Sequence, residues 1–362
     1  MASMGCRIGF VRRGFSSTGG AERYLLRFVE ALKQRGRTAV LFTTNEWPES
    51  ASAPFSSVHR LPDQGPTAFA DALSREQPKK HCDVLFSLER VWECDFYRAG
   101  DGVHRAWLAR RARSSSPLTR FFRAASRKHR EILALEARLF APSNSVRIIA
   151  NSELVKHEIA QEYGKAPSAI HVIYNGYKRP AVQGDPRTQI RASLRLQPED
   201  VMVLFVGSGW ERKGLRYAIQ ATRFLSDSRA QLFVIGKGKS FGMPRGPVTY
   251  LGAIPDVAPY YVAADLFLLP TLYDPFSNAC LEASAHGLPV VTSTANGFAE
   301  VFVHGVHGEV VEDPTDPAAI ARALKLWLDP KKRQATRELI RQNAQPLSVE
   351  ANVEATLRVI LS

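Results

Sequence analysis

Short apolar runs alternate with longer amphipathic stretches along the whole chain, and this alternation limits the fold more than any other feature. Each run has the length of a strand, and the stretches between them repeat their apolar residues at helical spacing. The predicted strands are Cys6–Val11, Ala39–Thr43, Val84–Leu88, Arg147–Ala150, His171–Tyr174, Met202–Val206, Gln231–Ile235, Val248–Leu251, Leu266–Leu269 and Pro289–Thr292. The predicted helices include Ala21–Arg35, Leu154–Tyr163, Leu215–Phe224 and Ala279–His286. Continuously apolar strands separated by helices are typical of parallel sheets covered on both faces.

The chain length predicts two such sheets. A chain of 362 residues exceeds the usual size of one domain. We expect an N-terminal domain over residues 1–175 and a linker over 176–200, which is rich in Pro, Gly, Gln and Arg. A C-terminal domain would follow over 201–345. The last segment, 346–362, would be a helix that closes either domain and could cross back to the first.

The composition is that of a globular protein, with 45% hydrophobic and 23% charged residues. Residues 1–14 resemble a strand rather than an export signal, and no apolar stretch of about 18 residues occurs that could span a membrane. The four cysteines have neither metal-site nor scaffold spacing, which indicates reduced thiols, mostly buried. We therefore expect a cytoplasmic protein.

Three glycine-containing or polar motifs each follow a predicted strand. The first, Gly14–Glu22, precedes a helix, so its paired glycines and the free amides of the helix start could approach an anion. A structural turn explains it almost as well. The second, Val206–Gly214, places two cations, Arg212 and Lys213, beside a helix start, which suits a diphosphate. A solvated basic loop is the alternative.

The third motif, Asp274–Glu282, carries one carboxylate before a helix and one in its second turn. Ionised oxygens accept hydrogen bonds from neighbouring sugar hydroxyls. Between the two acids, Ser277 and Asn278 are capping residues whose neighbouring amides would meet phosphate. Because ligands bind at the carboxyl ends of parallel strands, all three motifs are expected to line one cleft between the two domains.

The motifs together identify a resemblance. The chain resembles the retaining family 4 glycosyltransferases, which have the GT-B fold of two facing Rossmann-like, doubly wound domains. The matching segments are TGGAERYL, IIANSELVKHEI, IHVIYNGY, FVGSGWERKGL and DPFSNACLEASAHGLPVVTSTANGFAEV. Within that family it is most similar to the lipopolysaccharide core glucosyltransferases, on the segments GSGWERKG and Phe96–His104.

The resemblance implies that the domain over 1–175 is on the acceptor side and that the domain over 201–345 binds the donor, and it implies roles for individual residues. Gly19 and Gly20 would line the donor diphosphate, Arg212 and Lys213 would hold its phosphates, and Asp274 would contact the transferred sugar. Glu282 would bind the ribose, and Ser277 and Asn278 would bind the phosphate. Asp101, in the loop after strand 84–88, would receive the acceptor proton. No cofactor and no metal is implied, because the nucleotide sugar is a co-substrate; the spacing of His304 and His307, between glycines, indicates a structural role.

This sequence departs from the family at two positions. The first acid of the signature is Asp274 where the family has Glu, which would change the sugar preference or withdraw the carboxylate from the anomeric carbon. Ser208 follows the glycine of the second motif where many members have Arg, which leaves the phosphates to Arg212 and Lys213.

The positive charge is concentrated in the first half. Residues 1–180 have a net charge of +12 and residues 181–362 of +1, and nine cations lie in 105–130 without an acid. Aromatic residues interleave with these cations, so we expect this segment to contact an anionic membrane surface or a phosphorylated lipid-linked acceptor. The alternatives are a solvated helical face and, without a supporting motif, nucleic acid.

The sequence thus predicts a cytoplasmic, metal-independent, retaining hexosyltransferase at the inner membrane face. It would transfer glucose from UDP-glucose to a lipopolysaccharide-core-like or other lipid-linked glycan. The alternatives are a family 4 transferase with another donor and acceptor, a sugar-nucleotide epimerase on the same fold, and a non-catalytic protein that binds sugar nucleotides.

Overall fold

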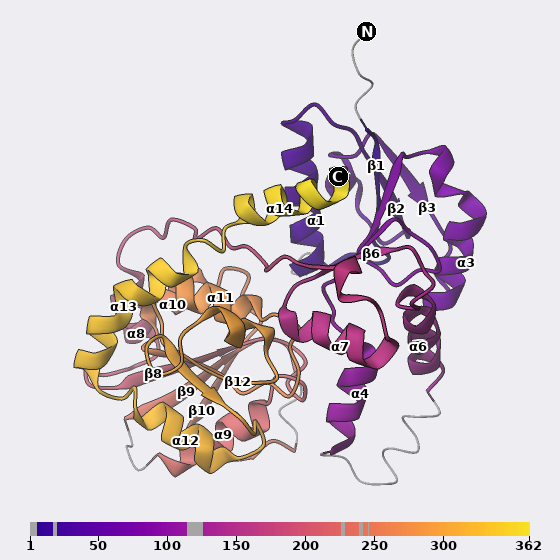
Figure 1. Ribbon diagram of the computed structural model, residues 1–362. Coiled ribbons are helices and arrows are strands. Elements are labelled where there is room, and N and C mark those ends of the chain that lie inside the picture. Colours follow the sequence, from indigo (N-terminus) through magenta and orange to yellow (C-terminus); the bar gives the residue numbers. More distant parts are fainter. Residues whose placement is uncertain (1–5, 17–19, 114–125, 226–228, 239–241, 245) are drawn as a thin grey trace. The chain divides into compact units, whose positions relative to one another are not determined.

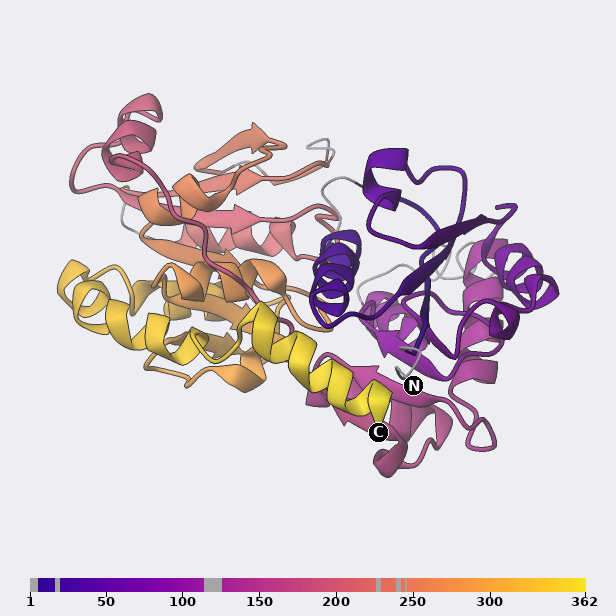
Figure 2. The same cartoon turned by 90° about the horizontal axis from the view of Figure 1, so that it is seen from above.

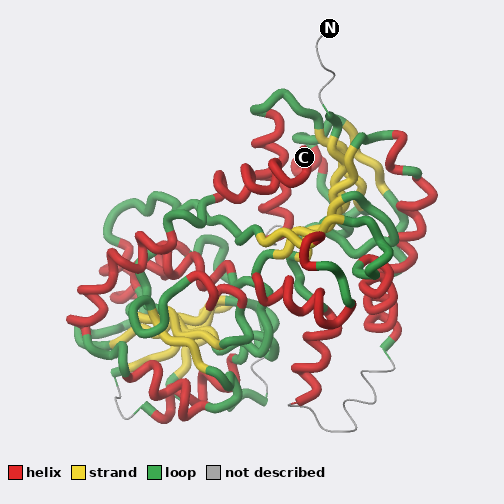
Figure 3. The backbone as a smooth tube through the Cα atoms, viewed as in Figure 1, coloured by secondary structure: helices red, strands yellow, loops and turns green. Residues whose placement is uncertain are grey.

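The chain forms two compact units in a computed structural model, which describes residues 6–16, 20–113, 126–225, 229–238, 242–244 and 246–362. Unit 1 comprises Met1–Tyr174 and Asn352–Ser362, and unit 2 comprises Asn175–Ala351 (Figure 1). In both units the strands lie in the middle and the helices outside (Figure 3). Two Rossmann-like domains with parallel sheets are therefore confirmed, while the cleft between them stays a prediction.

Unit 1 contains a seven-stranded parallel sheet in the order β3-β2-β1-β4-β5-β6-β7. Its strands are β1 Ile8–Val11, β2 Ala39–Thr43, β3 Ser57–Arg60, β4 Val84–Ser87, β5 Phe96–Ala99, β6 Arg147–Ala150 and β7 Ile170–Val172. Its helices are α1 Gly20–Lys33, α2 Glu49–Ser52, α3 Pro66–Glu76, α4 His104–Arg113, α6 Arg127–Leu139 and α7 Glu153–Tyr163, with the 3₁₀ turns η1 Pro78–Lys80 and η2 Pro167–Ala169.

Unit 2 contains a six-stranded parallel sheet in the order β10-β9-β8-β11-β12-β13. Its strands are β8 Val201–Val206, β9 Ala230–Ile235, β10 Val248–Gly252, β11 Leu266–Leu269, β12 Val290–Ser293 and β13 Gly308–Val311. Its helices are α8 Pro186–Ser193, α9 Leu215–Phe224, α10 Ala258–Ala263, α11 Asn278–Ala285, α12 Pro317–Lys325 and α13 Pro330–Ala344, with the 3₁₀ turn η3 Gly297–Val301.

The strand order of each sheet reverses at one point. In unit 1 the reversal lies between β1 and β4, and in unit 2 between β8 and β11. In doubly wound folds, ligands bind at the carboxyl ends of the strands where the order reverses. The first motif follows β1, the second follows β8 and the third follows β11. All three therefore lie at the carboxyl edge of their own sheet, at its reversal.

All ten predicted strands are present with ends shifted by at most two residues, but three further strands were missed. β3 is a polar, half-exposed edge strand without an apolar run. β5 contains a buried arginine, Arg98, whose guanidinium lies 3.9 Å from the centre of the Tyr24 ring. β13 begins at Gly308, where a Cβ atom would lie 1.9 Å from the carbonyl oxygen of Val290. Each of these strands forms through tertiary contacts, and its own sequence lacks the apolar pattern of a buried strand.

Residues 176–200 differ from the prediction of a linker without regular structure. They belong to unit 2 and contain α8, whose Arg187 and Arg191 each make an ion pair of 2.8 Å with Asp265 at the start of β11. Arg191 is buried. Part of the predicted linker is thus a packed element of the second unit.

The C-terminal helix α14, Val349–Leu361, begins in unit 2 and contributes residues 352–362 to unit 1 (Figure 2). There Thr356 is fully buried and its hydroxyl lies 3.5 Å from that of Tyr24 on α1. Glu354 makes an ion pair of 2.9 Å with Arg35. These contacts join the last eleven residues to the first unit.

All four cysteines are free thiols, two of them buried. Within the described part of the chain, no helix has both the length and the apolar character needed to cross a membrane.

Candidate functional site

The loop after β8 is held tightly against the loop after β11. Gly214 has a φ of 74°, and a Cβ atom there would lie 1.9 Å from the carbonyl oxygen of Pro270, so no other residue fits without movement. The carbonyl oxygen of Arg212 accepts hydrogen bonds of 2.8 Å from the Leu272 amide and from the Thr271 hydroxyl. The second and third motifs therefore form one structure at the carboxyl edge of the unit 2 sheet.

Lys213 and Asp274 form the central ion pair of this structure. The Lys213 ammonium donates to the Asp274 carboxylate, and the two side chains are 12% and 7% exposed. A buried ion pair costs desolvation on both sides, so such a pair is more often a functional or specificity device than a source of stability. The first acid of the signature thus faces a cation predicted to bind phosphate.

The backbone around Asp274 fixes its carboxylate. The Asp274 amide donates to Ala295 O at 2.9 Å, and its carbonyl oxygen accepts from the Gly297 amide at 2.9 Å. The buried Asn296 side chain accepts from the amides of Ser277 and Phe298 and donates to Thr292 Oγ1. Hydrogen bonds from the loop after β12 therefore fix the position of the start of the third motif.

Ser277 and Asn278 stand at the start of α11, as predicted from their type. Ser277 is the N-cap, and its hydroxyl accepts from the amide of Cys280 at 3.4 Å. Asn278 is exposed and accepts a hydrogen bond of 2.8 Å from Asn175 Nδ2. The first amides of a helix have no intrahelical partner and carry a partial positive charge, so this end of α11 suits an anion.

Glu282 lies one turn further along α11. Its Oε2 accepts a hydrogen bond of 3.0 Å from the buried hydroxyl of Tyr261 on α10. Burial, followed by the Glu282 charge, raises the pKa of Tyr261 well above its usual value. The tyrosine therefore stays neutral and acts as a fixed donor that orients the carboxylate.

Arg212 differs from its neighbour Lys213. It is half-buried, and among the described residues its guanidinium makes neither a hydrogen bond nor an ion pair. An arginine at a switch point with its five donors unused can bind phosphate oxygens in a bidentate manner.

The carboxyl edge of the unit 1 sheet is organised around Arg12, directly after β1. Its guanidinium donates to Glu22 at 2.9 Å and to Glu89 at 2.7 Å, so one cation lies between two carboxylates. Burial raises the pKa of Glu89, the Arg12 charge opposes this shift, and the Asp101 charge adds to it. The first helix and the loop after β4 thus meet in an acidic cluster.

Asp101 follows β5, and the prediction that its loop comes directly after strand 84–88 was wrong. The missed strand β5 lies between them, but β4 and β5 are parallel neighbours, so both loops still leave the same edge of the sheet. Asp101 is exposed in a turn closed by a hydrogen bond from the Gly102 amide to Ala99 O at 3.1 Å. Arg90 Nη2 donates to Gly102 O at 2.7 Å and fixes this turn.

Two of the predicted features lie partly or wholly outside the described residues. Gly19 is outside them, while Gly20 is the exposed first residue of α1. The basic segment 105–130 is described only in α4 and from Ser126 onward. The last turn of α4 contains the three arginines Arg110, Arg111 and Arg113, of which Arg110 makes an ion pair of 2.8 Å with Glu158.

Sequence reasoning missed four residues of these edges: Arg12, Glu89, Tyr261 and Asn296. The first two directly follow predicted strands, so the rule that found the motifs could also have found them. Tyr261 orients the Glu282 side chain and Asn296 binds backbone amides, and no local pattern marks either residue.

Cysteine and histidine side chains of unit 2 make structural contacts among the described residues. Burial raises the pKa of the Cys280 thiol to about 12, so it stays protonated. His304 and His307 each accept a backbone amide, from Val310 and Val303, in keeping with a structural role. Among the described residues, the one group of three metal-type ligands lies elsewhere in unit 1, at His59, Glu76 and His81.

Two family descriptions match the chain, one in each unit. Residues 18–178 match the glycosyltransferase family 4 domain, and residues 200–329 match the domain called glycosyl transferases group 1.

Curated relatives are similar at low identity. An uncharacterized glycosyltransferase, MJ1607 of Methanocaldococcus jannaschii, is 30% identical over 51% of this chain and 52% of its own length. The chain thus spans about half the length of that relative. A D-inositol 3-phosphate glycosyltransferase of Geodermatophilus obscurus is 27% identical over 86% of this chain and 78% of its own. The lipopolysaccharide glucosyltransferase WaaG of Escherichia coli is 23% identical over 85% of each.

Solved structures share the fold. WaaG, a glycosyltransferase involved in lipopolysaccharide biosynthesis, superposes with a TM-score of 0.80 at 22% identity, over 98% of this chain and 99% of that one. Alr3699/HepE of Anabaena, in complex with UDP-glucose, gives a TM-score of 0.71 at 18% identity, over 98% and 100%. The two units therefore have the GT-B fold of these proteins.

Proposed function

We propose that this chain, which carries a glycosyltransferase family 4 domain and a group 1 domain, transfers glucose from UDP-glucose to a lipid-linked glycan resembling a lipopolysaccharide core. The transfer would retain the configuration at the anomeric carbon and need no metal ion. The observation that carries the proposal is the pair of adjacent cations, Arg212 and Lys213, at the strand-order reversal of unit 2.

The two cations would act on the leaving diphosphate. As the bond between the anomeric carbon and UDP breaks, negative charge develops on the phosphate oxygens, and fixed cations stabilise it. Arg212 has its donors unused among the described residues, and Lys213 is already oriented by Asp274. The Ser277 amide already donates to the Asn296 side chain, so the amide of Asn278 and those of Gly19 and Gly20 would add the neutral donors.

The acids of the third motif would bind the sugars. Asp274 would accept hydrogen bonds from the hydroxyls of the transferred glucose, and Glu282, oriented by Tyr261, from the ribose. Because Lys213 contacts Asp274, the same pair would couple recognition of the sugar to recognition of its phosphate. The aspartate is one methylene shorter than the family's glutamate, which would change the sugar preference or withdraw the carboxylate from the anomeric carbon.

Asp101 would act on the acceptor. The acceptor hydroxyl oxygen forms the new bond to the anomeric carbon, and its proton passes to the Asp101 carboxylate. This side chain is exposed at the carboxyl edge of unit 1, close enough to Arg12 and Glu89 for its charge to influence both. The Arg12 guanidinium lies between two acids, which it would orient without taking part in the reaction itself.

The proposal also places the reaction at the cytoplasmic face of the inner membrane. The arginines of α4 belong to the basic segment 105–130, which would contact anionic lipid or phosphate groups of the acceptor. WaaG, similar over 85% of the chain, is named as a lipopolysaccharide glucosyltransferase and supports this acceptor.

A second acceptor class is favoured by a specific observation. Relatives of similar coverage are named D-inositol 3-phosphate glycosyltransferases. A small phosphorylated polyol would also suit the basic segment, and it would require no membrane. Transfer to a phosphorylated inositol but not to a lipid-linked heptose would decide for this alternative.

A thermal-shift screen of donors tests the proposal. UDP and UDP-glucose should raise the melting temperature, since a ligand that binds only the folded state stabilises it by mass action. GDP- and ADP-sugars at equal concentration should leave it unchanged. A flat response to every nucleotide sugar contradicts the proposal, and UDP binding without transfer or hydrolysis of any UDP-sugar supports a non-catalytic protein. Formation of an epimer without acceptor supports an epimerase.

A further inference from the structure

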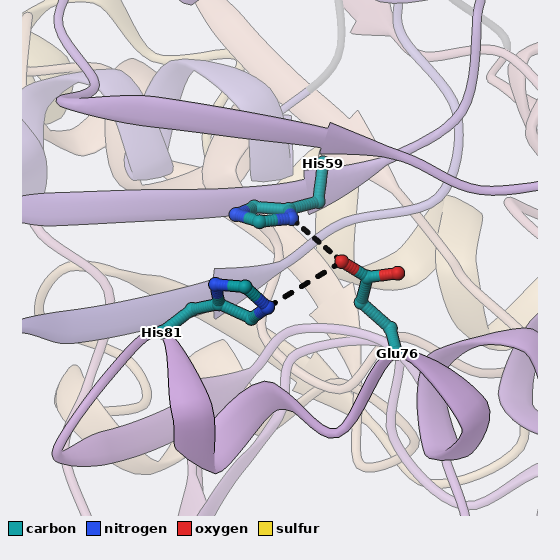
Figure 4. A group of neighbouring side chains, drawn as sticks. All are labelled: His59, Glu76 and His81. Carbon is teal, nitrogen blue, oxygen red and sulfur yellow. Dashed lines mark hydrogen bonds and ion pairs between the residues drawn. The ribbon is translucent and has the colours of Figure 1, made fainter.

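We propose that His59, Glu76 and His81 in unit 1 form a binding site for a divalent transition-metal ion of the zinc class, separate from the residues assigned to sugar transfer. The three side chains come from three elements: β3, the last residue of α3, and the residue after η1 (Figure 4). They are the one group of three His, Cys, Asp or Glu ligands found in the described part of the chain.

The ligand atoms already converge. His59 Nδ1 lies 2.8 Å and His81 Nε2 3.5 Å from the same oxygen, Oε1 of Glu76, and all three atoms lie within 4.8 Å of one another. Zinc bonds of about 2.0–2.1 Å in tetrahedral geometry separate neighbouring ligand atoms by roughly 3.3 Å. The observed separations bracket this value, so the site needs adjustment of side chains only.

Both ring nitrogens point at Oε1 in Figure 4. An ion would take the place where the two nitrogens converge, and the flexible Glu76 side chain would move back by roughly 2 Å to bind it from the other side. The Glu76 carboxylate thus contacts both ring nitrogens directly where the ion would lie, and it would remain a ligand after moving back.

The donor set fits one class of metal. Two imidazoles and a single carboxylate are ligands of zinc and neighbouring first-row ions, whereas magnesium and calcium prefer sites made of oxygen alone. The side chains of His59, Glu76 and His81 are 18%, 33% and 34% exposed. Solvent therefore reaches the group, so an ion could enter and a water molecule could complete its coordination.

The surroundings hold the two rings in place. The His59 ring stacks on Phe42, the neighbouring residue on β2, with 4.9 Å between centroids and 26° between planes. The His81 ring in turn lies 4.1 Å from that of His59. Since Phe42 is fully buried in the core, it holds the His59 ring in a fixed orientation.

The backbone between the second and third ligands is strained. Gln77 caps α3 with a φ of 53°, a left-handed conformation that is unfavourable for a residue with a side chain. This turn leads directly into η1 and returns the chain so that His81 faces Glu76. Strained residues persist where the surrounding structure requires them, often at ligand sites.

An ion here would join the edge strand β3 to the connection between α3 and β4. β3 is the outermost strand of its sheet and lies two strands from β1, at which the strand order reverses. The ion would therefore act on the stability of this edge of unit 1 and would take no part in bond breaking at the sugar.

Zinc(II) titrated into untagged, chelator-treated protein tests the site. One equivalent should bind, by calorimetry and by competition with a chromophoric chelator, and the melting temperature should rise with zinc concentration. His81→Gln and Glu76→Gln should each weaken binding by at least about 100-fold, because loss of a mere supporting contact already costs 10–100-fold. Both variants should lose the zinc-dependent rise in melting temperature. Without zinc, they should melt at the same temperature as the unmodified metal-free protein.

Two matched variants control for other ligands. His157 is exposed on α7 of the same unit, and Cys6 is the partly exposed thiol before β1. His157→Gln and Cys6→Ser should bind zinc as the unmodified protein does. Absence of one-to-one binding in the unmodified protein overturns the proposal, and so does undiminished affinity in both His81→Gln and Glu76→Gln. UDP-glucose binding is not involved in any arm, so the result is independent of the proposed function.

Discussion

The two carboxyl edges are built on the same kind of parallel sheet but carry opposite chemistry. In unit 2, adjacent cations stand beside the start of a helix, and Lys213 is matched by one acid, Asp274. In unit 1, one cation, Arg12, is shared by two acids, and a third acid, Asp101, is exposed beside them. The first arrangement suits a diphosphate, and the second suits the removal of a proton.

This difference shows that overall charge is a poor guide to the chemistry of a site. Residues 1–180 hold nearly all of the excess positive charge, yet the carboxyl edge of their sheet is acidic. Residues 181–362 are nearly neutral, yet their edge presents Lys213 with one acidic partner and Arg212 with none among the residues that the structure describes. The position of a charge relative to strand ends decides its role.

The largest expected effect separates the two edges directly. Asp101→Ala should lower the transfer rate about 10²–10⁴-fold, the usual contribution of a general base, and leave UDP affinity unchanged. Glu282→Ala should instead weaken UDP binding by about 10–100-fold, through loss of hydrogen bonds to a charged group. Steady-state kinetics and calorimetry with UDP measure both. Equal loss of donor affinity in the two variants would remove the distinction between the edges.

The buried pair of unit 2 should respond next most strongly. Asp274→Ala leaves Lys213 buried without its partner, and the free energy of unfolding should fall by about 3–5 kcal/mol. The double variant Lys213→Met with Asp274→Leu should recover most of that loss but remain inactive. Urea titrations measure the unfolding free energies. For comparison, Glu93→Ala, which breaks an exposed pair with Arg138, should cost less than about 1 kcal/mol.

Arg212 should affect binding without affecting stability. Arg212→Gln should weaken UDP binding by about 10–100-fold, since it removes charge-assisted hydrogen bonds to phosphate. The unfolding free energy should change by no more than about 0.5 kcal/mol, because the described residues include no partner for this guanidinium. Arg322→Gln, on the exposed face of α12, is the matched loss of charge and should leave UDP binding unchanged. A stability loss as large as that of Asp274→Ala would point to a structural role.

The smallest effect is a pH dependence at the acidic edge. Burial raises the pKa of Glu89 above its ordinary 4.5, so the folded chain holds this proton more tightly than the unfolded chain. The resulting stabilisation is complete below about pH 4.5 and is lost as the pH rises through the folded pKa. Relative to Glu89→Gln, the unmodified protein should therefore lose stability as the pH rises from that value. Glu30→Gln, exposed on α1, should show no such difference; a reversed trend would mean that Arg12 dominates over burial.

Much of the architecture could be predicted because buried parallel strands are visible in the sequence as apolar runs. The order of strands and the pairing of their ends could not. Lys213 and Asp274 were each selected as site residues, but their contact depends on β8 and β11 being neighbours, with Gly214 pressed against Pro270. The edge strand β3 was missed for another reason, because it is polar and has no apolar run, and with it the approach of His59 to Glu76 was missed.

Unit 1 is assembled from both ends of the chain, and this has a consequence during synthesis on the ribosome. After Tyr174 emerges, the 177 residues of unit 2 must follow before Asn352–Ser362 can dock. At about 5–20 residues per second, that delay is roughly 9–35 s. Over this interval the surface of α1 at Tyr24, which receives Thr356, is uncovered, whereas unit 2 emerges as one uninterrupted segment. A nascent chain that terminates about a dozen residues early therefore lacks the segment that completes unit 1, although unit 1 is synthesised first.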